Sequence, residues 1–497
     1  MLNSISGVSP MAYTAPTSGV SATKVDTEVR GPEFSYNPQD ELVMDPITIQ
    51  VPNIKTSSKK APEGEHVRLA DKDGLRPNKD GEYVFQPGTR QYIAANTMAT
   101  IQSTVNAMSE KFGQDINWAF GEKQIKLIPD GGVMLNAYYS RQDESLNFFH
   151  AKDPVTQQQV YTGSSGEVVS HEAGHAILDA IRPGFLSSWH ADTNGFHEAF
   201  GDLTALYMSS QNDQVCELAA RECGGDLHKP NCLSATGELL GRTINNEAGR
   251  NVTGGDHVRS LINDFKWQAP HTVDRNPSGT DPLTTEVHSW SRIFSGAQYD
   301  VMAAMTQRNM ADGMDAAAAI KAAGSESMDV LAKAINISPK ENATYRDIAL
   351  CMLKADEEMG GKNHDIILNC MQERNILFEG DDTPSGVSMA SVPAHDMTVT
   401  LDGPEFGKFS GAEVTAKVSS GIGAMNDNPG QDLINDMKMH IQNGSILYTE
   451  PNQVVEKKDL FDKNGNAYIG VVRWTDGKMT IERNTMIRSY AQLILPS

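Results

Sequence analysis

The stretch GEVVSHEAGHAILDAIRPG, residues 166–184, has the pattern of one amphipathic helix that ends at a proline and a glycine. His171 and His175 are four residues apart, so both imidazoles project from one face, about one turn from each other. Glu172 projects from a neighbouring part of the same surface. In this HExxH arrangement the two histidines bind one zinc ion, and the glutamate takes a proton from a metal-activated water.

The alternative interpretation is a surface helix with two solvated histidines, whose buried face carries Val168, Ile177 and Leu178. HExxH arises by chance in on the order of a few per cent of chains of this kind. The motif alone therefore does not establish a metal site. A third ligand is needed.

A second predicted helix, GFHEAFGDLTALY at residues 195–207, supplies one. Glu198 and Asp202 share a face of this helix, and two carboxylates so near a buried face require partners. Glu198 would complete a His-His-Glu set with one metal position left for water, and Asp202 would accept the free N–H of a ligand histidine. His197 is the rival ligand, ranked lower because adjacent helical residues face about 100° apart.

Length and composition limit the kind of protein. The chain has 497 residues, enough for roughly two to four domains. Its net charge of −22 argues against nucleic acid or an anionic membrane as partner. No apolar run reaches the roughly 18 residues of a membrane span, and the N-terminus lacks the basic and apolar regions of a secretory signal. We expect a cytoplasmic protein, or one exported by a specialised route.

The predicted fold class is α+β. A leader rich in Ser, Thr, Pro and Gly is expected to be disordered, and the tail alternates short β-like runs with turn pairs. The five cysteines leave a small disulfide loop within residues 216–232 or free buried thiols as alternatives. The predicted units are a disordered leader at 1–60, a β-rich lobe at 61–182, a mainly helical lobe at 183–379, a linker at 380–395 and a β-rich accessory domain at 396–497.

VVSHEAGHAILDAI and NGFHEAFGDLTALY together resemble the two active-site helices of the thermolysin-like neutral zinc metallopeptidases, the gluzincin class. The similarity covers roughly residues 90–380. It implies a two-lobed fold, one catalytic zinc ion and endopeptidase activity on proteins or peptides. It also implies a preference for a large apolar residue on the primed side of the cut.

Three further segments carry the resemblance. EVHSWSRIFSGAQYD is similar to the family segment with the catalytic histidine, which implies that His288 stabilises the oxyanion. GGDHVRSLIND resembles the segment with the substrate-positioning arginine, here Arg259. LNAYYS resembles the edge strand on which substrate lies, so Asn136 and Ala137 would hydrogen-bond its backbone.

The sequence departs from the family at several positions. Trp189 stands where a tyrosine usually donates to the oxyanion, and its indole N–H is expected to take that role. Either Asp281 or Glu286 is expected to orient His288. Glu167 matches one calcium carboxylate, but Ser209 stands where a further acid is expected, so the family's double calcium site is not carried over.

The expected function is a zinc-dependent endopeptidase. One alternative is a catalytically silent, zinc-stabilised scaffold whose C-terminal domain binds a partner, although such a scaffold has no need for Glu172 beside the metal. The other is an exopeptidase, for which the sequence offers no anchor for an N-terminal amine. The sequence makes no prediction of the natural substrate or of the oligomeric state.

Overall fold

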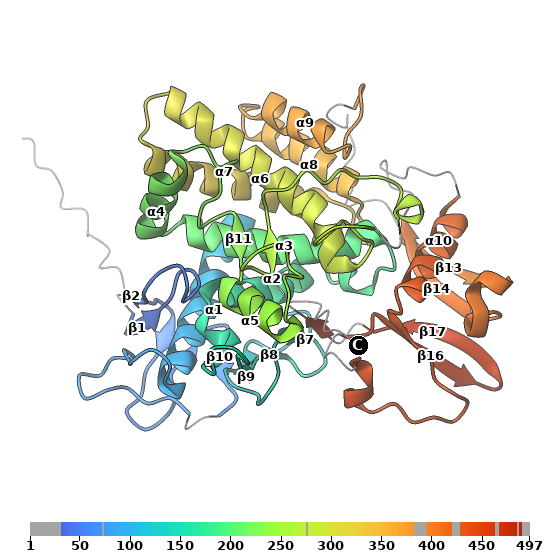
Figure 1. Ribbon diagram of the computed structural model, residues 1–497, viewed down its shortest axis with the longest axis horizontal. Helices are drawn as coiled ribbons and strands as arrows, with labels where there is room; N and C mark the ends of the chain where they lie inside the picture. Colours follow the sequence, from blue (N-terminus) through green and yellow to red (C-terminus); the bar gives the residue numbers. More distant parts are fainter. Residues whose placement is uncertain are drawn as a thin grey trace, which may run out of the picture.

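The computed structural model describes residues 31–71, 74–274, 277–381, 394–419, 428–462, 467–484 and 487–489. The helices are α1 (Arg90–Phe112), α2 (Gly166–Ile181), α3 (Ala191–Ser210), α4 (Asp213–Cys223), α5 (Glu238–Ala248), α6 (Val287–Ala311), α7 (Ala316–Ile337), α8 (Tyr345–Glu358), α9 (His364–Glu373) and α10 (Pro429–Gln442). Figure 1 shows α6 to α9 stacked on one side, the N-terminal strands on the other and the C-terminal unit at one end.

Strands belong to several sheets, and the predicted α+β class is confirmed. The N-terminal strands are β1 (Glu33–Tyr36), β2 (Ile47–Gln50), β3 (Ile54–Lys55), β4 (Glu63–Gly64), β5 (Val67–Leu69), β6 (Ile125–Ile128), β7 (Ala137–Ser140), β8 (Ser145–Phe148), β9 (His150–Lys152) and β10 (Gln159–Tyr161). The later strands are β11 (Ala235–Thr236), β12 (Arg259–Ser260), β13 (Ala394–Thr400), β14 (Glu413–Ser419), β15 (Ile446–Leu447), β16 (Gly470–Thr475), β17 (Lys478–Arg483) and β18 (Ile487–Ser489).

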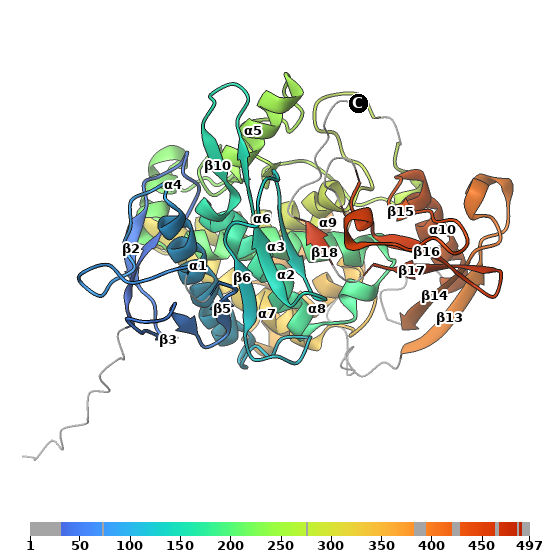
Figure 2. The same cartoon turned by 90° about the horizontal axis from the view of Figure 1, so that it is seen from below.

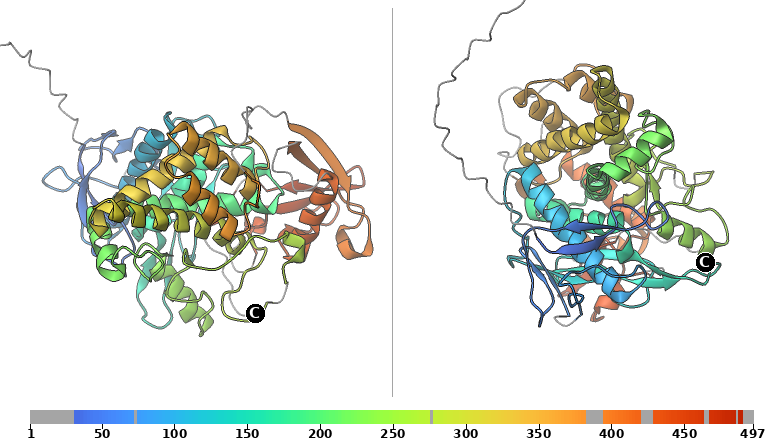
Figure 3. Two further views of the ribbon diagram at one scale, coloured as in Figure 1. Left: turned by 90° about the horizontal axis from the view of Figure 1, so that it is seen from above. Right: turned by 90° about the vertical axis from the view of Figure 1, so that its left-hand side faces the viewer.

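A mixed seven-stranded sheet has the order β18-β7-β8-β6-β5-β4-β3. Strands β7 and β8 are antiparallel, with Ala137 opposite Phe148, whereas β8 and β6 are parallel. Helices α1 and α2 pack on this sheet and on each other. Figure 3 shows the helical layer of α6 to α9 lying over these N-terminal elements. A single large hydrophobic core runs through them, with fully buried side chains such as Phe34, Phe200 and Tyr345.

Part of the predicted disordered leader is ordered, which corrects the expectation for residues 31–60. Strands β1 and β2 pair antiparallel there, and the Phe34 ring stacks on Tyr83 with centroids 4.7 Å apart. The backbone N–H of Gly166 donates to the Gln39 carbonyl at 2.8 Å. These partners are distant in sequence, so local composition did not reveal them. Residues 1–30 of the predicted leader lie outside the described residues.

The C-terminal unit combines a sheet with a helix. Its strands have the order β13-β14-β17-β16-β15. Helix α10 corrects the expectation of short strands only. Asn428 caps it by accepting from the Gln431 N–H at 3.2 Å, and Leu433 and Met437 are buried one turn apart. Residues 382–393 of the predicted linker lie outside the described residues.

No disulfide joins any of the five cysteines, all of which are described and buried. Within the described ranges, no helix is long and apolar enough to cross a membrane. Strand β18 leaves the C-terminal unit and pairs with β7 of the N-terminal sheet, contrary to the predicted division. Figure 2 shows β18 apart from the other red strands.

Candidate metal centre

Helices α2 and α3 cross at a close distance because both carry a glycine at the contact. A Cβ on Gly174 would lie 2.9 Å from Thr204 Oγ1, and one on Gly201 would lie 2.6 Å from His171 Cε1. A larger residue at either position would separate the helices. The close approach therefore places Glu198 of α3 against the histidines of α2.

His171, His175 and Glu198 form one compact group of side chains. Their ligand atoms all lie within 4.8 Å of one another. The two Nε2 atoms are 3.0 Å apart, and Glu198 Oε2 is 3.6 Å from that of His171 and 3.4 Å from that of His175. Each side chain is at most 1% exposed. Burial opposes ionisation of Glu198, yet His288 and His175 keep its pKa well below the usual range. This group could hold a metal ion.

The opposite nitrogens of both histidines have partners. His171 Nδ1 lies 3.0 Å from Asp202 Oδ1, as predicted from the spacing of α3. His175 Nδ1 lies 2.8 Å from His197 Nδ1. His197 therefore lies behind His175, and the group that could hold a metal ion contains Glu198 and not His197. The orienting contact of His197 was missed, because only the packing of α2 on α3 reveals it.

Arg259 is buried beside Asp202 in a two-point contact. Its Nε donates to Asp202 Oδ2 at 2.9 Å, and its Nη2 donates to Oδ1 at 2.7 Å. Burial favours the neutral carboxyl, but the Arg259 charge and His171 hold the pKa of Asp202 below its usual range. A charged Asp202 is thus available to orient His171. Arg259 thus lies beside Asp202, whose other contact is with His171.

His288 approaches the group from the start of α6. Its Nε2 is 3.5 Å from Glu198 Oε2, and its Nδ1 is 2.7 Å from Glu286 Oε1. Glu286 also caps α6, because its Oε2 accepts from the His288 N–H at 3.0 Å. Asp281 instead pairs with Arg292 at 2.6 Å, so Glu286 is the acid that orients His288. Burial lowers the pKa of His288, but Glu286 and Glu198 outweigh it and raise the value to about 9.

Glu172 is fully buried on the same helix as the two histidines. Neither carboxylate oxygen accepts a hydrogen bond within the described part of the chain. Burial and the charge of Glu198 raise the pKa of Glu172 well above its ordinary value, against the influence of the Tyr139 backbone and Arg259. A carboxylate of raised pKa is a stronger proton acceptor than one on the surface.

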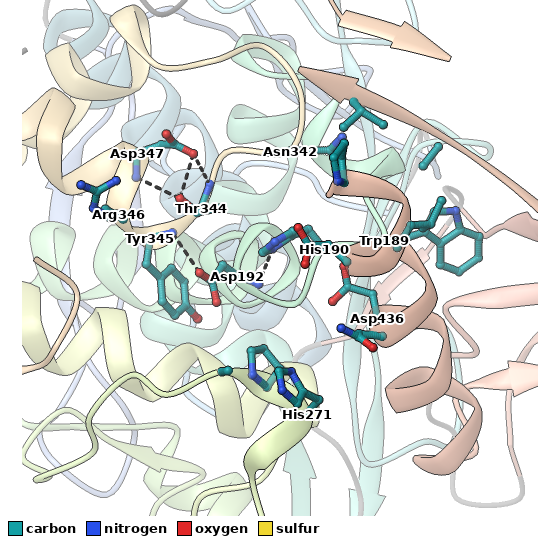
Figure 4. Close-up of a pocket in the computed structure, with 18 of the residues that line it drawn as sticks. Trp189, His190, Asp192, His271, Asn342, Thr344, Tyr345, Arg346, Asp347 and Asp436 are labelled. Carbon is teal, nitrogen blue, oxygen red and sulfur yellow. Dashed lines mark hydrogen bonds between the residues drawn. The ribbon is translucent and has the colours of Figure 1, made fainter. Parts of the chain in front are cut away.

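Trp189 does not belong to this group, which corrects its predicted role as oxyanion donor. Its indole Nε1 donates to the Thr415 carbonyl of β14 at 3.4 Å, and its ring joins the hydrophobic core of the C-terminal unit. It lines a separate cavity of about 820 Å³ between the helical lobe and that unit (Figure 4). Its side chain points away because the segment before α3 packs against the C-terminal unit: His440 Nε2 lies 2.8 Å from the Trp189 carbonyl oxygen.

Asn136 and Ala137 are both fully buried at the start of β7. The Ala137 N–H donates to Asn136 Oδ1 at 2.9 Å. The resemblance of LNAYYS to a substrate-binding edge strand implies that the edge of this strand is open. That expectation is wrong for residues 138–140, where β18 pairs with β7.

A second acidic group lies at the first turn of α2. Glu167 and Asp40 are buried there beside the half-buried Glu238, and only Glu167 was a candidate from the sequence. Burial and the neighbouring charges raise the pKa of Glu167 well above its usual range, and that of Glu238 to about 8. The Ser209 hydroxyl donates to the Pro38 carbonyl at 2.9 Å instead of standing among these acids.

No protein-family model matches the chain, and no curated protein matches it.

Proposed function

We propose that the protein is a zinc-dependent endopeptidase whose metal is held by His171, His175 and Glu198. The single observation that carries the proposal is the geometry of these three donors. Ligands about 2.0–2.1 Å from a tetrahedral ion are about 3.3 Å apart, and the separations here are 3.0, 3.4 and 3.6 Å. Two imidazoles and one carboxylate are also the donor set that leaves catalytic zinc one position for water.

A bound zinc ion would supply a Lewis acid that acidifies water and polarises the scissile carbonyl. Glu172 takes the proton from the attacking water and passes it to the leaving amine. Its burial beside Glu198 supports this role, because both raise its affinity for a proton. Asp202 holds His171 through Nδ1, and His197 does the same for His175.

His288 stabilises the negative charge that develops on the carbonyl oxygen. Glu286 holds its Nδ1, so that Nε2 faces the side of the group where Glu198 lies. Arg259, oriented by Asp202, binds the substrate carbonyl beyond the cut. Trp189 has no part in this mechanism.

The substrate is an extended protein or peptide segment. It pairs with β7 through main-chain hydrogen bonds at Asn136 and Ala137 and carries a large apolar residue on the primed side. The thermolysin-like two-lobed arrangement belongs to the same proposal: one lobe contains the seven-stranded sheet with α1 and α2, the other contains α3 to α9. Cleavage sites with acidic or basic primed-side residues would contradict this substrate preference.

A structural metal site is the second candidate function, favoured by the near-complete burial of the three ligands. Glu172 and His288 count against it, because a structural site needs neither a proton acceptor nor an oxyanion donor. An exopeptidase is a weaker candidate, and comparison of blocked with free peptides separates it from an endopeptidase.

The test is cleavage of a blocked peptide library by the purified chain and by Glu172→Gln, read by mass spectrometry beside metal analysis. We expect cleavage before large apolar residues, and a loss on the order of a thousandfold or more in Glu172→Gln with zinc retained. Glu110→Gln, on the exposed face of α1, is the matched control and should cleave normally. Equal cleavage by Glu172→Gln would reject the proposed base, and no cleavage by any zinc-loaded form would favour the structural site.

A further inference from the structure

Strand β18 lies on the edge of β7 that faces away from β8. The two strands are antiparallel, with Ile487 opposite Ser140, Arg488 opposite Tyr139 and Ser489 opposite Tyr138. From its first to its last residue, β18 therefore runs toward Ala137. Figure 2 shows it separated from the sheet of the C-terminal unit. A strand from the C-terminal part of the chain thus completes the N-terminal sheet.

The covered part of β7 adjoins the candidate metal centre. The Tyr139 hydroxyl donates to Asp179 Oδ2 of α2 at 2.7 Å, so β7 is tied to the helix that carries the two histidines. Residues 138–140 directly follow Asn136 and Ala137, where substrate is proposed to begin pairing. An extended peptide that pairs along β7 for more than two or three residues requires the edge that β18 covers.

Arg483, the last residue of β17, anchors the chain shortly before β18 begins. Arg483 donates through Nε to the Ser188 carbonyl at 2.7 Å and through Nη2 to the Asn194 side chain on α3. Its guanidinium also lies over the Trp189 ring, 5.2 Å from the centroid. Trp189 is thus part of the anchor that joins the two units. Only residues 484–486 separate this anchor from β18.

A second contact from the C-terminal unit reaches the same strand. The Phe461 ring lies 5.7 Å from that of Tyr138, centroid to centroid. Glu172 and His175 have no exposed surface. An endopeptidase must admit a peptide chain to these groups, so some covering element has to leave before substrate binds.

We propose that β18 is an intramolecular inhibitory strand, which occupies the edge of β7 that an extended substrate needs. The inference rests on the proposed endopeptidase function. Strand addition uses main-chain hydrogen bonds, so β18 competes with substrates of any side-chain sequence. A three-residue strand binds weakly on its own, but the short connection to Arg483 gives it an effective concentration of about a millimolar or more.

The test compares the full chain with a variant that lacks residues 485–497 and keeps the Arg483 anchor. A competing strand reduces the fraction of chains able to bind substrate. We therefore expect the deletion to raise kcat/KM on blocked peptides about tenfold, mainly through a lower KM. A synthetic peptide of residues 483–492 should restore the inhibition competitively with substrate.

A substitution series separates main-chain pairing from side-chain effects. Arg488→Pro/Ser489→Pro removes two adjacent N–H groups, of which one points toward β7. It should activate the enzyme as the deletion does. Arg488→Ala/Ser489→Ala is the matched control, because it keeps both N–H groups and should remain inhibited.

Amide hydrogen exchange of residues 138–140 gives a readout that does not depend on activity. We expect faster exchange in the deletion variant. Equal kcat/KM in the full chain and the deletion variant would overturn the inference and leave the proposed function intact. No cleavage by either zinc-loaded chain would overturn the proposed function, and the inhibitory role with it.

Discussion

Two groups of titratable side chains lie along helix α2, and the pKa of the central glutamate is shifted in opposite directions in them. At its first turn, Glu167 meets Asp40 and Glu238, and its pKa is raised well above the usual range. One turn later, His171 belongs to the group of Glu198, and the pKa of Glu198 is held well below its usual range. Burial opposes ionisation in both places. The difference lies in the neighbours, which are carboxylates in the first group and imidazoles in the second.

This comparison explains which group is suited to a catalytic metal. A carboxylate that stays charged beside imidazoles is a ready metal ligand, and two imidazoles and one carboxylate leave a bound zinc ion with a net positive charge. Carboxylates that crowd one another retain protons at neutral pH instead.

The largest expected effect is on zinc content, which should differ between variants of Glu198 and of Glu167. Glu198→Gln should reduce bound zinc from about one ion per chain to nearly none, because it removes a charged ligand. Glu167→Gln lies on the same stretch of α2 and should leave zinc content unchanged. Metal analysis after dialysis against a weak chelator measures both variants. Loss of zinc in Glu167→Gln but not in Glu198→Gln would mean that the metal binds at the acidic group of Glu167 instead.

The second prediction concerns the two acids that were candidates to orient His288. Glu286→Gln should lower kcat about tenfold with little change in KM, because the imidazole loses the partner on Nδ1. Asp281→Asn disturbs only the pair with Arg292 and should leave kcat within about twofold of the parent. Steady-state kinetics on one blocked peptide decides between them. A larger loss in Asp281→Asn than in Glu286→Gln would reverse the assignment.

The third prediction concerns the acidic group and the pH dependence of stability. Burial and the Asp40 charge raise the pKa of Glu238 from 4.5 to about 8. The folded state therefore binds more protons than the unfolded state between these values, and the free energy of unfolding falls as pH rises through this window. Glu238→Gln removes this contribution. It should raise the free energy of unfolding by on the order of a few kcal/mol at pH 8.5 and leave it unchanged near pH 4.

Urea unfolding of Glu238→Gln at both pH values measures this effect, with Glu217→Gln on the exposed face of α4 as the control. A variant that is less stable than the parent only when calcium is present would contradict the prediction. That outcome would mean that Asp40, Glu167 and Glu238 hold a cation, as the match of Glu167 to a family carboxylate left open.

Much of the candidate centre could be predicted because it depends on helical periodicity. The four-residue spacing of His171 and His175, and that of Glu198 and Asp202, places each pair on one face wherever the helices lie. The group of His171, His175 and Glu198 was therefore predictable, as was the contact of Asp202 with His171. The acid that orients His288 was narrowed to Asp281 or Glu286, because residue spacing alone does not specify which of them caps α6.

The sequence by itself determined the α+β class and the residues that local periodicity brings together. Only the tertiary structure decided where the Trp189 side chain points and that His197 lies behind His175. It also decided that the segment after residue 30 is ordered and which strand pairs with β7. Each of these depends on contacts between segments far apart in the chain, and the residues concerned satisfy local rules equally well in several arrangements. Strand pairing shows this most clearly: main-chain hydrogen bonds carry no side-chain signature, so the occupant of the β7 edge is visible only once the fold has brought β18 to it.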